Sequence, residues 1–265
     1  MIKRIIVSII ALPLVVVLMY FGGWWLAGGI AAVAMLGQIE FYRAFGKLSG
    51  WHFAAMAATL GLVSLLMFAE NIPIGLYAIL VLVALAFCTP LFFVRQNSAT
   101  TAVFGFFYVT GLIFAVVVMR QQLGLYLAWM IFIAAWGSDT GAYFCGKAFG
   151  KRKLVPKLSP NKTVAGSVGG AITAAVLSVT YGVILHHLGI WEFGNLTIGL
   201  LSFAAFGLLG AIFAQCGDLA ASAIKRHVGI KDFGQLIPGH GGILDRFDSI
   251  LFVAPFALIY FYNVA

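Results

Sequence analysis

The sequence predicts an all-α integral membrane protein, a polytopic bundle of about nine transmembrane helices. Charged residues make up only 9% of the 265-residue chain, whereas about a quarter of a soluble domain is charged. Hydrophobic residues make up 63%, and the mean hydropathy is +1.06. The apolar runs carry no turn signals and approach the roughly 20 residues that a helix needs to cross a bilayer. The ten-residue alternation of an outer-membrane barrel is absent from the sequence.

The apolar runs define the spans in order along the chain. The expected spans are 5–21, 24–39, 52–69, 74–94, 101–119, 122–138, 164–185, 196–216 and 249–264. The first resembles a signal peptide, but it is longer than a cleaved core and lacks an A-x-A-like site, which favours a retained helix. We expect a single polytopic domain over 1–265. Its N-terminal spans occupy 1–136, and a motif-bearing part occupies 137–265, with cytosolic loops at 139–163 and 217–248.

Lys and Arg are distributed unevenly between the two sides that these spans define. With the N-terminus inside, every Lys and Arg lies on the inner side except Arg120. Because basic loops stay in the cytoplasm, we expect an N-in, C-out, multi-pass protein of the cytoplasmic (inner) membrane, with its active site on the cytoplasmic side. The net charge of +8 then faces anionic lipid headgroups and soluble nucleotides. No basic stripe with interleaved aromatic residues lies outside the spans, which argues against a nucleic-acid partner.

The chain has only eight acidic residues, and most of them fall at the inner ends of spans. Glu40 lies beside Arg43 at a span end, and for it, as for the two acids of the outer loops, solvation or a local ion pair is the expected role. Glu70 and Glu192 lie in outer loops. Ionisable groups at membrane depth are costly, so the other acids are candidates for a functional site. These are Asp139, Asp218, Asp232, Asp245 and Asp248.

Asp245 and Asp248 are three residues apart at the expected start of the last helix, so they share one helix face. Converging carboxylates without a Cys or His cluster suit a hard cation such as Mg²⁺, bound together with substrate phosphates. The alternative is helix capping with a salt bridge from Arg246.

Asp218 lies near the end of another apolar span. If that helix continues past Gly217, then Asp218, Ser222, Lys225 and Arg226 lie on one face. A carboxylate, a hydroxyl and two cations can bind phosphate and metal. The competing role for the two cations is contact with lipid headgroups.

Two further segments carry candidate ligand-binding groups. In 237–245, Gly239, Gly241 and Gly242 allow backbone N–H groups to approach a ligand, and His240 lies between them, although a structural role in the turn stays open. In 139–163, Asp139 precedes a turn predicted at 159–163 that leads into the next helix. Hydroxyls and a Lys at a helix start can hold an anion. The basic residues of this segment also follow from the positive-inside rule alone.

These residues form an extended pattern: S-A-I-K-R, four residues, then K-D-F-G-Q-L-I-P-G-H-G-G-I-L-D-R-F-D over 222–248. It resembles the full motif of the phosphatidate cytidylyltransferases, also called CDP-diacylglycerol synthases. The resemblance extends to GSDTGAY at 137–143, to KLVPKLSPNKTVAG at 153–166 and to Gly217-Asp218-Leu219. Together with the number of spans, it covers essentially the whole chain.

The resemblance implies transfer of CMP from CTP to phosphatidic acid within a lipid bilayer, with release of pyrophosphate and a requirement for Mg²⁺. It implies that three acids bind the metal: Asp218, Asp245 and Asp248. It implies catalytic roles for these three together with Lys225 and Arg226. The implied substrate-binding residues are Asp139, Ser159, Lys162, Thr163, Ser222, Lys231, Asp232, His240, Gly241, Gly242 and Arg246.

Two positions depart from the family pattern: Ala221, where relatives often have Glu, and Ala165, where many have Glu or Gln. Two other functions stay open. A CTP-dependent lipid-alcohol kinase would release CDP, and a transporter of phosphorylated anions would also place charges at membrane depth. The sequence also leaves open whether a second cation such as K⁺ joins Mg²⁺, whether the chain forms a homodimer, and which acyl chains or nucleotide it prefers.

Overall fold

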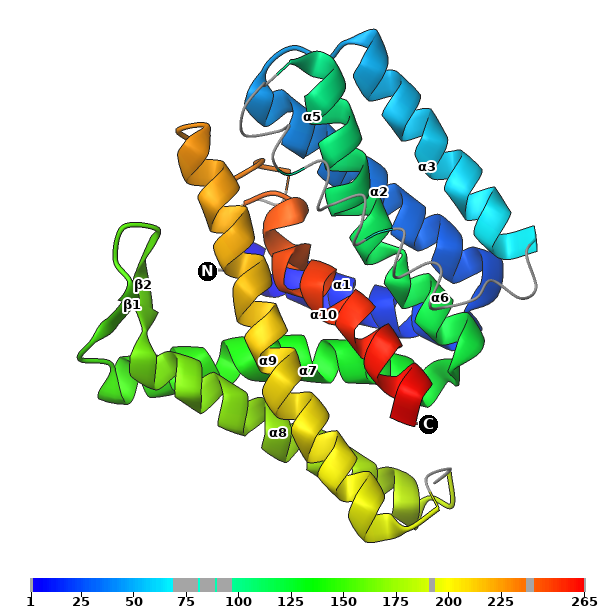
Figure 1. The fold of residues 1–265 in the computed structure, drawn as a ribbon, viewed down its shortest axis with the longest axis vertical. Helices are drawn as coiled ribbons and strands as arrows, with labels where there is room; N and C mark the ends of the chain where they lie inside the picture. Colours follow the sequence, from blue (N-terminus) through cyan, green and yellow to red (C-terminus); the bar gives the residue numbers. More distant parts are fainter. Residues whose placement is uncertain are drawn as a thin grey trace. The chain divides into compact units, whose positions relative to one another are not determined.

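The computed structural model describes residues 2–68, 81, 89, 97–190, 194–236 and 241–264, with side chains from residue 12 onward. The chain divides into two compact units. Figure 1 shows their helices and strands with labels. Unit 1 comprises Met1–Leu125 and Lys225–Phe247, and unit 2 comprises Tyr126–Ile224 and Asp248–Ala265. The helices of unit 1 are α1 (Ile2–Phe21), α2 (Gly23–Phe45), α3 (Gly50–Phe68), α5 (Ser98–Gly105), the π-helical turn η1 (Phe106–Gly111) and α6 (Ala115–Gln122).

Unit 2 contains α7 (Gly124–Phe149, from Tyr126), β1 (Lys153–Val155), β2 (Ser159–Thr163) and α8 (Val164–His187). It also contains most of α9 (Leu196–His227) and most of α10 (Leu244–Val264). The last residues of α9 and the first of α10 belong to unit 1.

Six helices of the described residues are long and apolar enough to cross a membrane, as expected of a helical membrane protein. They are Gly23–Phe45, Gly50–Phe68, Ser98–Gln122, Val164–His187, Leu196–His227 and Leu244–Val264. Each contains one predicted span or most of it.

The other three predicted spans have different outcomes. The span at 5–21 lies in α1, of which only the short apolar stretch Leu12–Phe21 is described in full. The span at 74–94 lies outside the described residues, except for Val81 and Thr89. The span at 122–138 lies in α7, which is helical but is not among the six apolar helices, because its second half carries polar residues. The predicted number of nine is therefore not confirmed.

The predicted loops are shorter than expected, and this part of the prediction is wrong. Helix α7 continues to Phe149, α9 continues to His227, and α10 begins at Leu244. Hydropathy marks only the apolar part of a helix, whereas the backbone hydrogen bonds continue until a stop signal. For α9 the stop is Gly229 at φ +75°, with hydrogen bonds from Ile230 N to Lys225 O (2.9 Å) and from Gly229 N to Arg226 O (3.2 Å).

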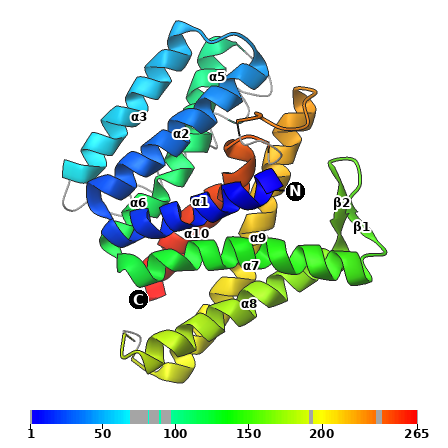
Figure 2. The ribbon, with the colours of Figure 1, turned by 180° about the vertical axis from the view of Figure 1, so that it is seen from behind.

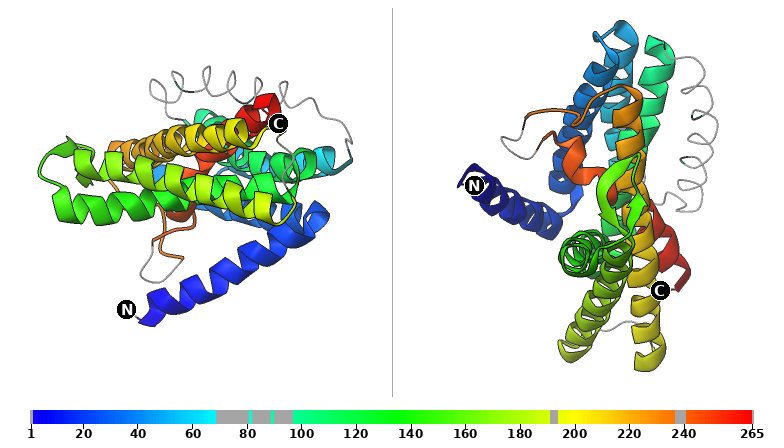
Figure 3. Two further views of the ribbon diagram at one scale, coloured as in Figure 1. Left: turned by 90° about the horizontal axis from the view of Figure 1, so that it is seen from below. Right: turned by 90° about the vertical axis from the view of Figure 1, so that its left-hand side faces the viewer.

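A β-hairpin also corrects the prediction of an all-α chain. Strands β1 and β2 pair antiparallel, with Lys153 opposite Thr163 and Val155 opposite Ser159. The predicted turn at 159–163 is therefore a strand. Its last residue, Thr163, caps α8 by accepting a hydrogen bond from Gly166 N at 3.1 Å. The hairpin lies at one end of α7 and α8, as Figures 2 and 3 show from further sides.

In unit 1, aromatic rings and a polar trio hold the helices together. Phe41 of α2 lies 5.9 Å from Phe104 and 6.0 Å from Tyr108 between ring centroids. The polar trio consists of Thr59, Gln38 and Thr110: Thr59 Oγ1 of α3 lies 3.2 Å from Gln38 Oε1 of α2 and 3.1 Å from Thr110 Oγ1 of η1. These three side chains are fully buried, so the trio joins three elements through hydrogen bonds.

In unit 2, small residues let the helices approach closely. A Cβ on Gly207 of α9 would lie 2.6 Å from Ala175 Cα of α8, and a Cβ on Gly141 of α7 would overlap the Thr173 side chain of α8. Such contacts are typical of helix packing in membranes. Further along α9, a Cβ on Gly217 would overlap the backbone carbonyl of Asp248 on α10.

The Gly217→Ala variant is therefore expected to destabilise unit 2 by about 1–3 kcal/mol, because backbone atoms cannot rotate away from the new methyl group. The measurement is the thermal unfolding midpoint in detergent. Gly28→Ala is the control, because a Cβ on Gly28 meets nothing within 4 Å. Equal midpoints for the two variants would show that α9 and α10 do not pack this closely.

Candidate functional site

Unit 2 contains a polar pocket of about 280 Å³ where α7, the hairpin, α8 and α9 meet. Its polar lining includes five of the predicted site residues: Asp139, Ser159, Lys162, Thr163 and Asp218. These residues come from three elements, α7, β2 and α9. Leu154, Asn161, Ser167 and Gln215 also line the pocket.

An ion pair between β2 and α9 forms one wall of this pocket. Lys162 Nζ lies 2.7 Å from Asp218 Oδ2, and the side chains are 21% and 31% exposed. The ammonium also donates a long hydrogen bond to Gln215 O at 3.5 Å. Because the pair is only partly buried, an anion can reach the ammonium. Hydroxyl and amide side chains also line the pocket.

Gln215 and Ser167 are pocket residues that the sequence analysis missed. Ser167 Oγ donates to Gln215 Oε1, and Gln215 Nε2 donates to Ser167 O at 3.1 Å and to Ser138 Oγ at 3.5 Å. These bonds tie α7, α8 and α9 together beside the pocket. A Gln within an apolar run was the available signal, because amides are rarely placed in a membrane helix without a partner.

Thr163 is buried, and its hydroxyl accepts the Gly166 amide, so its first role is to cap α8. Gly146 of α7 packs closely against this cap, because a Cβ added at Gly146 would lie only 3.1 Å from Thr163 Oγ1. Ser159 is half-buried, whereas Asp139 and Asn161 are exposed at the pocket rim.

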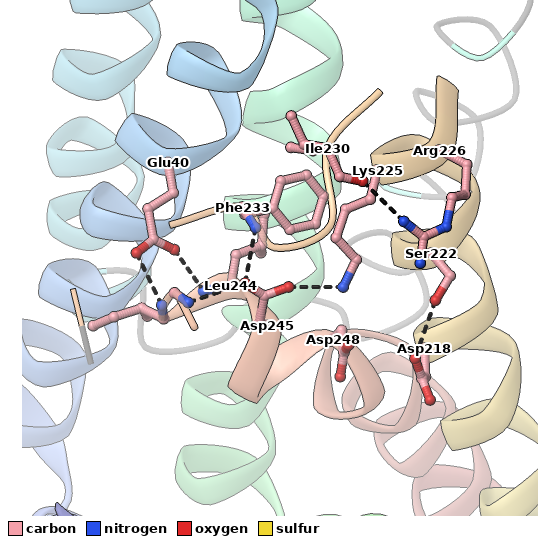
Figure 4. Close-up of polar contacts among 12 residues, drawn as sticks. Glu40, Asp218, Ser222, Lys225, Arg226, Ile230, Phe233, Leu244, Asp245 and Asp248 are labelled. Atoms are coloured by element: carbon pink, nitrogen blue, oxygen red, sulfur yellow. Dashed lines mark hydrogen bonds and ion pairs between the residues drawn. The ribbon is translucent and has the colours of Figure 1, made fainter. Parts of the chain in front are cut away.

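Helix α9 continues past Gly217, which was the condition for the predicted polar stripe. Ser222 Oγ donates to Asp218 Oδ1 at 3.4 Å, one helical turn away (Figure 4). On α10, Asp248 Oδ1 accepts the amide of Ser249 at 2.7 Å. The close approach of Gly217 to the Asp248 backbone places Asp218 and Asp248 near the same helix crossing.

In unit 1, Asp245 forms a buried ion pair with Lys225. Lys225 Nζ donates to Asp245 Oδ1 at 2.7 Å, and the side chains are 10% and 4% exposed. Asp245 Oδ2 accepts the amides of Phe233 (2.8 Å) and Gly242 (3.0 Å), and the Lys225 ammonium lies 5.4 Å from the centroid of the Phe233 ring (Figure 4). The carboxylate of Asp245 thus binds two backbone amides that precede α10, and its cation is Lys225.

The remaining predicted residues of unit 1 are mostly exposed. Arg226 donates to Ile230 O at 3.1 Å and is exposed, as are Lys231, Asp232 and Arg246. Gly241 adopts φ +84°, a backbone conformation that favours glycine. His240 and Gly239 lie outside the described residues.

Glu40 was misjudged from the sequence, because it is neither solvated nor paired with Arg43 in the structure. It is 8% exposed, and its two carboxylate oxygens accept the amides of Ile243 (3.0 Å) and Leu244 (2.9 Å) in unit 1 (Figure 4). The cost of a carboxylate in an apolar span was the signal that should have made it a candidate.

Within neither unit do the described residues bring three Asp, Glu, His or Cys side chains into a metal-binding arrangement. The donor set nevertheless suits Mg²⁺ in part. Asp218 and Asp248 belong to unit 2, are half-exposed and lie near one helix crossing. Both oxygens of Asp245, by contrast, already accept hydrogen bonds. Ligation through Asp245 would therefore compete with these bonds.

The predicted residues thus fall into two groups, a pocket in unit 2 and a carboxylate-bound turn in unit 1. Several known proteins are similar in sequence to this chain. Phosphatidate cytidylyltransferase of Bacillus subtilis is 46% identical over 136 residues, which are 51% of this chain and 47% of the relative. The enzyme of the same name from Haemophilus influenzae is 45% identical over 143 residues, 52% of this chain and 46% of the relative.

A third relative, phosphatidate cytidylyltransferase of Staphylococcus saprophyticus, is 41% identical over 145 residues, 55% of this chain and 52% of the relative. The chain therefore spans about half the length of the curated relatives it matches. The sequence model of the cytidylyltransferase family matches residues 2–264, nearly the whole chain. By this match, together with its helical membrane fold, the chain belongs to the cytidylyltransferase family.

Proposed function

We propose that the chain transfers CMP from CTP to phosphatidic acid, which gives CDP-diacylglycerol and pyrophosphate in phospholipid biosynthesis. The observation that carries the proposal is the polar pocket of unit 2, in which Lys162 and Asp218 form an accessible ion pair. It lies in a chain whose family match covers residues 2–264 and whose relatives are named phosphatidate cytidylyltransferases.

The proposed reaction joins a phosphate oxygen of phosphatidic acid to the α-phosphorus of CTP. The bond from that phosphorus to the oxygen bridging the β-phosphate breaks, and pyrophosphate leaves with the electron pair. A phosphomonoester has its second pKa near 6, so the attacking oxygen needs no dedicated general base at neutral pH. The main task is to neutralise and align two polyanions.

Lys162 is the proposed phosphate contact in unit 2, with Ser159 and Asn161 as hydrogen-bonding neighbours in the pocket lining. Its present partner, Asp218, holds the ammonium near the pocket until an anion replaces part of that interaction. Lys225 and Arg226 are proposed to screen further phosphate charge, since Arg and Lys bind phosphate oxygens strongly.

Asp218, Asp245 and Asp248 are the proposed ligands of Mg²⁺, because carboxylate oxygens suit this ion and the crossing at Gly217 supports the first and third of them. When bound, Mg²⁺ would neutralise phosphate charge and stabilise the leaving pyrophosphate. The contribution of Asp245 would require its Oδ1 to exchange Lys225 for the metal.

Pyrophosphate release by the purified chain in detergent tests the proposed function. CTP and Mg²⁺ are supplied with and without phosphatidic acid. Release that depends on phosphatidic acid is the expected result. Formation of CDP with an added lipid alcohol would instead support a lipid kinase, and absence of any nucleotide turnover by folded protein would overturn both enzyme assignments.

The membrane topology is proposed to be N-in and C-out with about nine spans in the inner membrane, and with the polar site facing the cytoplasm. In a background with the native cysteines replaced by Ser, Lys157→Cys in the hairpin should resist a membrane-impermeant maleimide in intact cells. Gly194→Cys, before α9, should be labelled. The reverse pattern would contradict the orientation.

A further inference from the structure

Glu40 is a buried carboxylate of α2 that contacts a segment more than 200 residues later in the sequence. Each of its oxygens accepts one backbone amide, Oε1 from Ile243 and Oε2 from Leu244. These N–H groups lie at the start of α10, where a helix leaves its first N–H groups without partners of its own. Glu40 therefore caps α10 from another helix, and its charge is favourable at that end.

Two glycines make room for this carboxylate. A Cβ on Gly234 or on Gly242 would overlap the carboxylate of Glu40. Neither glycine has a positive φ, so the requirement for glycine here comes from the closeness of Glu40 and not from the backbone conformation. The turn that precedes α10 is thus shaped around the Glu40 side chain.

The same turn binds the second buried carboxylate. Gly242 touches Glu40 and donates its amide to Asp245 Oδ2, and Leu244, which donates to Glu40, immediately precedes Asp245. Asp245 in turn holds Lys225 at 2.7 Å. The position of the Lys225–Asp245 pair therefore depends on the bonds that Glu40 makes (Figure 4).

We propose that Glu40 is a positioning residue, which sets the start of α10 so that Lys225 and Asp245 are correctly placed for the reaction. This proposal rests on the proposed cytidylyl transfer. The carboxylate is needed because both of its oxygens accept hydrogen bonds, whereas a Gln at this position would turn an NH₂ group toward one of the two amides. Two buried N–H donors would then face each other without an acceptor, and the turn that precedes α10 would move to separate them.

Glu40→Gln is expected to lower kcat on the order of tenfold to a hundredfold, because small displacements of catalytic groups have effects of this size. The KM for CTP should change much less. Thr59→Val is the matched control: it breaks the buried polar trio of the same unit without touching the turn, so it should lower the unfolding midpoint and keep kcat. Loss of kcat in both variants in proportion to stability would reduce Glu40 to a structural role and overturn the proposal.

A size-compensating pair tests the contact directly. Gly242→Ala should lose activity because its methyl group overlaps the Glu40 carboxylate. Adding Glu40→Asp, which shortens the side chain by one carbon, should recover at least part of that loss. A double variant no better than the product of the two single losses would contradict the steric contact.

Limited trypsin digestion gives a readout that needs no activity. Lys231, exposed in the same loop, should be cleaved faster in Glu40→Gln, whereas cleavage at the exposed Lys157 of the hairpin should not change. Unchanged cleavage at Lys231 would overturn the positioning role. If Glu40→Gln speeds cleavage at Lys231 but the wild-type chain itself releases no pyrophosphate, the contact of Glu40 with the turn is supported and the proposed function is rejected.

Discussion

We expect the Asp245→Asn variant to release no pyrophosphate and to have a less stable unit 1. The substitution leaves the Lys225 ammonium buried without its partner, since the wild-type pair is 2.7 Å apart and the side chains are 10% and 4% exposed. Breaking a buried ion pair on one side costs about 3–5 kcal/mol. The amide also replaces one of the oxygens that accept the backbone N–H groups of Phe233 and Gly242 or the Lys225 ammonium.

Removing both charges separates the structural effect from the chemical one. The double variant Asp245→Asn with Lys225→Met should regain much of the lost stability, because no uncompensated charge stays buried, but it should remain inactive. The unfolding midpoint and the rate of pyrophosphate release are the two measurements. Lys47→Met, an exposed cation of the same unit, is the control for loss of positive charge. A fully active double variant would show that neither charge takes part in the reaction.

Lys162→Met is expected to raise the KM for CTP by about one to two orders of magnitude, because hydrogen bonds to charged groups contribute about 1.5–3 kcal/mol. Stability should change little, since the pair with Asp218 is partly exposed and such pairs contribute about 0–1 kcal/mol. Lys162→Arg should keep part of the affinity through its charge, with a different hydrogen-bond geometry.

Steady-state kinetics with varied CTP at saturating phosphatidic acid measure this effect. Lys157→Met is the matched control, because this exposed Lys lies in the same hairpin but does not line the pocket. If the two variants shift the KM equally, the hairpin contributes only general positive charge. If Lys162→Met leaves the KM unchanged, the unit 2 pocket does not bind the nucleotide phosphates.

Several features could be predicted from the residues in order along the chain. Apolar runs placed six of the helices, and they predicted that Asp245 lies at the start of the last one, α10. The motif also named the acidic and basic residues that line the unit 2 pocket. Hydropathy failed where polar segments remain helical, as at the ends of α7 and α9, because a helix is held by backbone hydrogen bonds that continue beyond its apolar part.

Composition, periodicity and motif spacing are local properties of a chain, so they predict the class of protein, the main helices and the types of residue at the site. The contacts of these residues depend on how the chain packs. Packing pairs Lys162 with Asp218 and Lys225 with Asp245, and it brings Glu40 to the start of α10. A buried charge takes whichever donor the packing of distant segments delivers, so neighbours such as Arg43 and Arg246 were poor guides to these contacts.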